Sequence, residues 1–265
     1  MYSLFFRAVL AMIGLWALVP GAMAADLVPH LAEYKLSLKS AKQGSGIAAL
    51  KGSMQFRFAD VCDGWTVENR TVMTFVEAEG EEVETQWSFV TWESKDGLRY
   101  RFRVTSLRNG DLVQEIQGQA SLEAPGGKGK ARLTKPEERS IVLPKGTLFP
   151  AAHTAMVINE AAMGKTSLQR VVFDGASLDS PQEVSALIGA PRKPQGKSNN
   201  PLLAGASWPS HMAFFEIGGK DGLPSYEISL RYFDNGIADD VVEDYGNFSV
   251  RSQLGKLEPL PRPDC

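Results

Sequence analysis

The chain has 265 residues, and its 28 lysine and arginine residues against 31 aspartate and glutamate residues give a formal net charge of −3. This mild acidity is the opposite of the basic excess that nucleic-acid binding requires, so we expect no nucleic-acid partner. Hydrophobic residues make up 43% of the chain and charged residues 22%, which is typical of a globular protein and excludes a disordered one.

The first 24 residues are typical of a cleavable secretory signal peptide. Arg7 is the only charged residue before Asp26, and an apolar run over residues 8–19 follows it. Ala22-Met23-Ala24 then supplies the small-x-small pattern of a cleavage site, which predicts a mature chain of residues 25–265. A retained N-terminal anchor is the alternative, but about a dozen apolar residues fall short of the about 20 that cross a bilayer. We expect an exported, single-domain protein that does not span a membrane.

Two cysteines, Cys62 and Cys265, remain after the predicted cleavage. An exported chain meets oxidising conditions, which favours a disulfide between them. The alternatives are an inert buried thiol at Cys62 and a reactive thiol at Cys265. A disulfide would also hold the last residue of the chain, which otherwise frays.

From residue 32 onward the dominant hydrophobic period is two, which predicts half-buried strands with an aromatic-rich apolar face and a polar face rich in Arg, Lys and Glu. Three dipeptides, Asp96-Gly97, Asn109-Gly110 and Asn235-Gly236, suit tight hairpin turns. The pattern predicts a mainly β fold, a meandering antiparallel sheet that must curl to bury one face. The alternating runs lie at residues 32–38, 51–58, 65–75, 83–89, 98–104, 226–232 and 248–250.

One segment, residues 151–163, predicts a helix that covers the sheet. Pro150 suits its first position and Gly164 suits its C-terminal cap. Residues 191–207, with three prolines and two glycines, predict a long loop, and residues 124–130 predict a shorter glycine-rich tip.

The sequence contains no recognisable catalytic or metal-binding motif. His30, His153 and His211 are not at metal-ligand spacing, and no Gly-x-Ser-x-Gly elbow occurs. A Ser-His-Asp arrangement could still assemble in space, because triads follow no fixed order along the chain. The Gly-Lys-Thr and Gly-Lys-Ser strings at 164–166 and 196–198 lack the earlier glycine of a phosphate-binding loop. The acidic residues at 234–244 lack the spacing of a calcium loop and are expected to be a solvated flank. We therefore expect no enzyme, no cofactor and no metal.

The aromatic face of the predicted sheet allows a ligand hypothesis. A curled sheet with a helix across it could hold an acyl chain or an amphipathic peptide, whereas the alternative is that the same side chains fill an ordinary core. The residues expected to line such a cleft are Phe56, Phe58, Trp87, Phe89, Tyr100, Phe102 and Met156.

Several local strings occur in an order that resembles the EipB-like cell-envelope integrity family of α-proteobacteria. They are VPHLAEY at 28–34, CDGWT at 62–66, LPKGTLFP at 143–150, VFDG at 172–175, WP at 208–209, PSYE at 224–227 and DYGNF at 244–248, with Cys62 and Cys265. The resemblance runs from about residue 28 to the C-terminus.

The resemblance implies a periplasmic, non-catalytic protein that maintains the cell envelope as a binding or scaffolding module, with an envelope protein as a partner. It implies a long antiparallel sheet wound into a β-spiral or half-barrel with one packed α-helix. It also implies a disulfide between Cys62 and Cys265, and it transfers no catalytic residue. The alternative role is a periplasmic carrier of lipid, lipoprotein or amphipathic peptide in a hydrophobic cleft.

Overall fold

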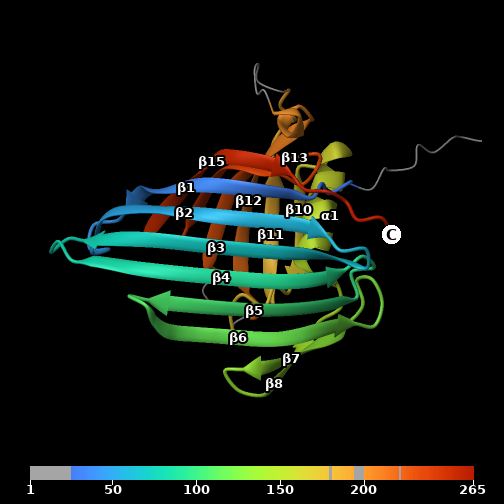
Figure 1. The fold of residues 1–265 in the computed structure, drawn as a ribbon. Coiled ribbons are helices and arrows are strands. Elements are labelled where there is room, and N and C mark those ends of the chain that lie inside the picture. Colours follow the sequence, from blue (N-terminus) through green and yellow to red (C-terminus); the bar gives the residue numbers. More distant parts are fainter. Residues whose placement is uncertain (1–24, 179–180, 194–199, 221) are drawn as a thin grey trace, which may run out of the picture.

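The computed structural model describes residues 25–178, 181–193, 200–220 and 222–265 (Figure 1). The predicted signal peptide, residues 1–24, and the Gly-Lys-Ser string at 196–198 lie outside these described residues. Within them the fold is mainly β, as the alternating pattern predicts, with fifteen strands, one α-helix and one short 3-10 helix.

The first half of the chain is a meander in which each strand pairs antiparallel with the next. Its strands are β1 (His30–Ala41), β2 (Ile47–Asp60), β3 (Gly64–Glu77), β4 (Glu82–Ser94), β5 (Arg99–Arg108), β6 (Asp111–Leu122), β7 (Gly129–Lys135) and β8 (Arg139–Leu143).

The second half begins with a crossover and then meanders back. The short β9 (Thr147–Leu148) and β10 (Ser167–Val172) are parallel, and helix α1 (Pro150–Ala162) connects them. The remaining strands pair antiparallel in sequence order. They are β11 (Gln182–Ile188), β12 (Ser207–Glu216), β13 (Tyr226–Phe233), β14 (Ala238–Asp244) and β15 (Phe248–Pro259), with the 3-10 helix η1 (Pro201–Leu203) before β12.

The first and last strands meet inside the sheet and join the two halves. The strand order is β8-β7-β6-β5-β4-β3-β2-β1-β15-β14-β13-β12-β11-β10-β9. In the pairing of β1 with β15, His30 lies opposite Pro259 and Ala41 lies opposite Phe248. Both chain ends are therefore in the interior of the sheet order, and β8 and β9 are its edges.

The sheet curls so that its two halves face each other. Figure 1 shows β1–β6 running across the front, β10–β12 running steeply behind them, and α1 at one end of the rear layer. This is the spiral of an antiparallel sheet with one packed helix that the sequence predicts. The described residues form two hydrophobic clusters in the interior. The smaller one, built on β5–β8, stacks Tyr100 on Phe149 with ring centroids 5.0 Å apart.

The predicted turns and helix are present, with small shifts in their limits. Asn109 and Gly110 have φ values of 50° and 87° between β5 and β6, which is the conformation that an Asn-Gly hairpin turn needs. Helix α1 covers residues 150–162, one residue earlier at each end than expected, because Pro150 is already helical. The glycine-rich tip is shorter than predicted, because β7 begins at Gly129.

Candidate functional site

A cavity of about 320 Å³ lies between the two facing halves of the sheet. Strands β1–β5 supply one wall, β13 and β14 supply the other, and the first turn of α1 supplies Pro150, Ala151 and Thr154. The other lining residues are Leu27, His30, Tyr34, Met54, Phe56, Phe58, Trp65, Val67, Asn69, Phe89, Thr91, Glu93, Tyr100, Ile228, Leu230, Tyr232, Asn235, Gly236, Ala238, Val241 and Glu243.

The alternation of the front strands places aromatic rings on the cavity side. Phe58 stacks on Trp65 with centroids 4.8 Å apart, and His30 lies 5.8 Å from Phe56 and 5.9 Å from Phe58. These rings come from adjacent strands, since His30 is the cross-strand partner of Phe58 in the β1–β2 register. The result is an apolar surface suited to aliphatic or aromatic groups.

Of the seven residues expected to line a cleft, four lie at this cavity: Phe56, Phe58, Phe89 and Tyr100. Trp87 and Phe102 belong with the smaller cluster, and Met156 packs against the larger one. Phe102 shares the inward face of β5 with Tyr100, but the ring of Phe173 covers it, with centroids 5.4 Å apart.

His30 is a neutral histidine in the cavity wall. Burial lowers the pKa of its imidazole, although the hydrogen bond to the Val28 carbonyl opposes that shift. Nδ1 lies 2.7 Å from this carbonyl oxygen, which can only accept, so Nδ1 carries the proton. His30 is thus fixed in one tautomer by the backbone two residues before it.

Glu93 on β4 is a carboxylate on the apolar face of the sheet, and it caps helix α1 from 58 residues away. Its Oε2 accepts the Ala151 N–H at 2.7 Å, and its Oε1 accepts the Ala152 N–H at 2.9 Å. The N-cap residue Phe149 has no side-chain acceptor, so Glu93 supplies the missing partner. Burial raises the pKa of Glu93 to about 7, against the opposing effect of these two hydrogen bonds.

The polar groups of the rear wall are bonded within the protein. Tyr226 donates its hydroxyl proton to Glu243 Oε1 at 2.8 Å, and burial raises the pKa of that carboxyl group. From the front wall, Tyr34 donates to the Ala238 carbonyl at 2.8 Å and so connects β1 to β14 across the interior. These polar groups are occupied within the protein, so the apolar surface is what this part of the wall offers a ligand.

The two ends of the described chain brace one side of the cavity. Leu27, which lines it, is buried beside Val28, whose N–H donates to the Asn235 carbonyl at 2.9 Å. The C-terminal tail runs along this segment: Leu260 N–H donates to the Pro29 carbonyl at 2.9 Å. Arg262 forms a salt bridge of 2.6 Å with Asp26.

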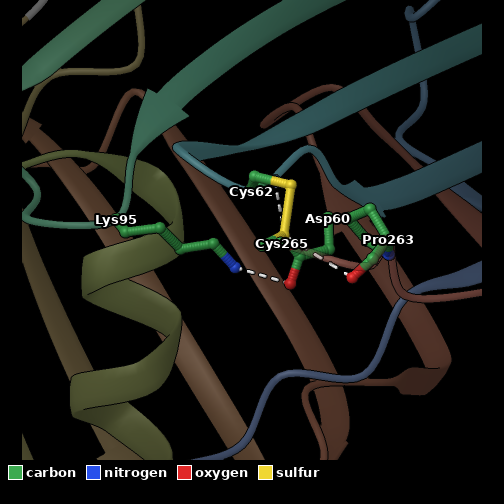
Figure 2. The surroundings of a disulfide bond; sticks show 5 residues. All are labelled: Asp60, Cys62, Lys95, Pro263 and Cys265. Carbon is green, nitrogen blue, oxygen red and sulfur yellow. Dashed lines mark hydrogen bonds and ion pairs between the residues drawn. A yellow bond between two sulfur atoms is a disulfide. The ribbon is translucent and has the colours of Figure 1, made fainter.

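The tail ends in the disulfide between Cys62 and Cys265, whose Cα atoms are 5.7 Å apart (Figure 2). Cys62 sits in the β2–β3 turn with a φ of 67°, and its N–H donates to Asp60 Oδ1 at 2.9 Å. Lys95 donates to Asp60 Oδ2 at 2.7 Å (Figure 2), and its ammonium lies 2.9 Å from the ring centroid of Trp65. The disulfide is therefore connected to the cavity wall through Lys95 and Trp65, as well as through the C-terminal tail.

The other two histidines do not line the cavity. His153 is buried in the first turn of α1, where burial, together with the charge of Arg170, lowers its pKa to about 4. His211 lies between two residues of β13: its Nδ1 is 2.9 Å from Ser229 Oγ, and its Nε2 is 3.1 Å from Glu227 Oε1. This is the serine–histidine–carboxylate grouping that sequence order could not reveal. Its residues alternate with the inward-facing Met212, Ile228 and Leu230, so the grouping lies on the outer surface and not in the cavity.

The acidic residues at 234–244 are engaged separately. Asp239 pairs with Arg231, and Asp240 pairs with Arg251 at 3.0 Å. In the part of the chain that the structure describes, no group of three or more His, Cys, Asp or Glu side chains could hold a metal ion. Lys165 of the Gly-Lys-Thr string forms a 3.1 Å salt bridge with Glu160. None of the described helices is long and apolar enough to cross a bilayer.

The rear wall and the Glu93 cap were not identified from sequence. Ile228, Leu230 and Tyr232 alternate visibly, but alternation does not say which strands face each other. Glu93 did leave a signal: it continues the inward series of Phe89 and Thr91, where a charged residue breaks the apolar pattern.

Comparisons with known proteins agree with this architecture. The family model described as EipB-like matches residues 21–261. The cell envelope integrity protein EipB of Brucella abortus (strain 2308) is 34% identical over 259 residues, covering 94% of this chain and 91% of that protein. A crystal structure from Brucella abortus, described as a beta-barrel-like protein of a domain of unknown function, superimposes with a TM-score of 0.82 at 33% identity. That match covers 90% of this chain and all of the other. The chain therefore belongs to the EipB-like family.

Proposed function

We propose that this protein is a periplasmic, non-catalytic component of the cell envelope that maintains envelope integrity by binding an apolar ligand or partner segment. The relative from Brucella abortus bears the name cell envelope integrity protein, and it aligns with this chain over 259 residues. The observation that carries the binding role is the aromatic cavity between the two halves of the sheet.

Export is supported by the position of Ala25, the residue that follows the predicted cleavage site. The backbone N–H of Ala25 donates to Asn159 Oδ1 at 2.7 Å, in the last turn of α1. Cleavage before Ala25 would place an α-ammonium group there, and the negative end of a helix favours a positive charge. The intact mass of protein from the periplasmic fraction should correspond to a chain that begins at Ala25. A protein that keeps residues 1–24, or that stays in the cytoplasm, would contradict the proposed export.

The carrier alternative is favoured by the size and lining of the cavity. Ligand pockets span about 300–1,000 Å³, and the cavity, at about 320 Å³, is at the lower end. This volume suits one acyl chain or one apolar side-chain cluster of a peptide and not a complete diacyl lipid. Each buried methylene group contributes roughly 0.8 kcal/mol, so an acyl chain would bind through its length.

Native mass spectrometry of gently purified protein tests the binding role. Wild-type protein should carry an apolar ligand that Val67→Trp, which fills the cavity, removes. Val72→Trp is the matched control, because Val72 lies on the same strand but is 39% exposed on the outer face. Ligand-free wild-type protein that also fails to bind added fatty acid would exclude the carrier role. An equal loss of ligand in both variants would show that the substitutions disturb folding and not the cavity in particular.

The non-catalytic role can be tested at Ser229, His211 and Glu227, whose arrangement resembles a catalytic triad. The His211 site lies on an outer sheet surface, away from the cavity that would exclude water from a reaction. We expect Ser229→Ala and His211→Ala to protect the envelope as well as wild type does, and to share its lack of esterase activity. A serine-dependent esterase activity would overturn this part of the proposal.

A further inference from the structure

The outer face of β5, β6 and β7 carries an ordered array of cations. In the register of these strands, Arg99, Arg101 and Arg103 of β5 lie opposite Ser121, Gln119 and Gln117 of β6. The same three β6 residues lie opposite Lys130, Arg132 and Lys135 of β7. Two rows of three cations therefore flank one row of neutral hydrogen-bonding side chains, and all nine residues are exposed.

The spacing of this cationic array follows from the sheet. Neighbouring strands are about 4.8 Å apart, so the two rows are roughly 10 Å apart, with the neutral row between them. Alternate residues along a strand are roughly 6.7 Å apart, so the β5 row is roughly 13 Å long, and a register shift before Lys135 keeps the β7 row opposite the same β6 residues. Such an array presents several positive charges to one extended anionic surface.

Part of the charge is not neutralised within the protein. Arg103 pairs with Glu115 at 2.8 Å, and Arg132 pairs with Glu138 at 3.2 Å. Among the described residues, Arg101, Lys130 and Lys135 form no salt bridge. Because the chain as a whole is acidic, with a net charge of −3, this concentration of positive charge is local.

Apolar side chains border the array on both sides. On β4, Val90 is 41% exposed and lies opposite Arg103. Trp92, opposite Arg101, has its ring centroid 4.9 Å from that guanidinium group. On β8, Val142 is 81% exposed and lies opposite Lys130. Cations beside exposed apolar side chains fit a lipid interface, which offers phosphate groups above hydrocarbon, better than they fit a fully hydrated polysaccharide.

We propose that the outer face of β5–β7 docks on a membrane surface that contains anionic phospholipids. Arginine can bind phosphate oxygens with two parallel N–H donors, and lysine adds a point charge. The glutamine row supplies further donors to the same headgroups. The interaction is superficial: the side chains contact headgroups, and the sheet stays outside the bilayer. This surface is distinct from the cavity, so it does not rest on the proposed ligand-binding role.

Vesicle flotation tests this docking. Mature protein should float with vesicles of phosphatidylcholine mixed with phosphatidylglycerol and not with phosphatidylcholine alone. Raised salt should release it, because ions screen contacts at exposed charges. Arg101→Gln/Lys130→Gln should weaken the binding by about tenfold or more, since each surface cation near an anionic leaflet contributes to affinity.

The matched control is Lys35→Gln/Lys39→Gln, which makes the same change in net charge on β1, four strands away from β5. It should bind as wild type does. Absence of wild-type binding to the anionic vesicles would overturn the proposal. An equal loss of vesicle binding in both double variants would also overturn it, because it would show that net charge, and not the array, determines binding. Binding to sedimented peptidoglycan in place of vesicles would assign the array to a polysaccharide and would also overturn it.

Discussion

Two buried ionisable residues at the start of α1 have pKa values that shift in opposite directions. Burial raises the pKa of Glu93 to about 7 and lowers that of His153 to about 4. Both shifts reflect the cost of charge in the interior, and for Glu93 the two helix N–H groups offset part of it. The contribution of Glu93 to stability therefore falls as pH rises, whereas the contribution of His153 falls as pH drops.

Glu93→Gln is expected to destabilise the protein, because one amide group cannot accept both the Ala151 and the Ala152 N–H as a carboxylate does. Leaving one buried donor unsatisfied costs about 1–3 kcal/mol. The folded pKa of Glu93 is above its unfolded value, so wild-type stability from this residue is greatest below about pH 4.5 and falls as pH rises towards 7. Denaturant unfolding at several pH values should show that Glu93→Gln removes this decline. An unchanged slope would assign the decline to other groups.

His153→Leu is expected to reduce sensitivity to acid. The folded pKa is below the unfolded value of 6.5, so the unfolded state binds the proton first and wild-type stability falls as pH drops from about 6.5 to about 4. At pH 5 the variant should exceed wild type by about 2 kcal/mol relative to the difference at pH 7. In wild type, Nε2 of His153 is one of two buried side-chain atoms without a hydrogen-bond partner among the described residues. Replacing the imidazole by leucine therefore loses no hydrogen bond at this atom. An unchanged acid response in His153→Leu would contradict the assignment.

Among the elements, seven of the fifteen described strands were predictable from alternation, and the others were not. Period-two alternation identified β1–β5, β13 and the start of β15, because a strand with one buried and one solvated face alternates in this way. It did not identify β6–β12 or β14. In β12, for example, Pro209 and the unbroken apolar run over residues 212–215 hide the alternation. The helix was predictable from Pro150 and Gly164, but its cap was not, since Glu93 is remote in sequence.

The disulfide joins the β2–β3 turn to the last residue of the chain, and its loss should destabilise the protein measurably. Closing a loop of 203 positions removes entropy from the unfolded chain equivalent to roughly 5 kcal/mol, which is an upper limit. Cys62→Ser and Cys265→Ser should each lower the thermal midpoint under oxidising conditions, and the double variant should be no worse than either. Reductant should lower wild type to the same level and leave the variants unchanged. Additive losses in the double variant would show that the two sulfur atoms act independently.

At the scale of the whole molecule, what the sequence could not predict is which strands face each other. The cavity exists because β13 and β14 return behind β1–β5, and this depends on the pairing of β1 with β15. Tyr34 illustrates the limit: its inward position follows from alternation, but its bond to the Ala238 carbonyl, 204 residues away, follows only from the curl. The same limit explains why three of the seven expected lining residues lie elsewhere than at the cavity. Alternation fixes which face of a strand a side chain is on, but not where along the interior it lies.

We predict that the chain ends limit access to this cavity. Leu27 lines it, and the segment around Leu27 is held by Asn235, by the tail residues Leu260 and Arg262, and through the tail by the disulfide. Loss of the disulfide frees the tail, so Leu27 should leave its position more often while the rest of the sheet stays paired. A ligand should then enter and leave faster without a large change in the number bound.

Stopped-flow binding of a polarity-sensitive naphthylamine dye measures this access. Cys62→Ser/Cys265→Ser should show faster association and dissociation than oxidised wild type, and Arg262→Gln, which removes the 2.6 Å salt bridge to Asp26, should lie between them. Val67→Trp should abolish the signal in either background, because it fills the space that the dye needs. Equal rates in wild type and the double cysteine variant, with the dye still excluded by Val67→Trp, would show that the ligand enters elsewhere and that the tail serves stability alone.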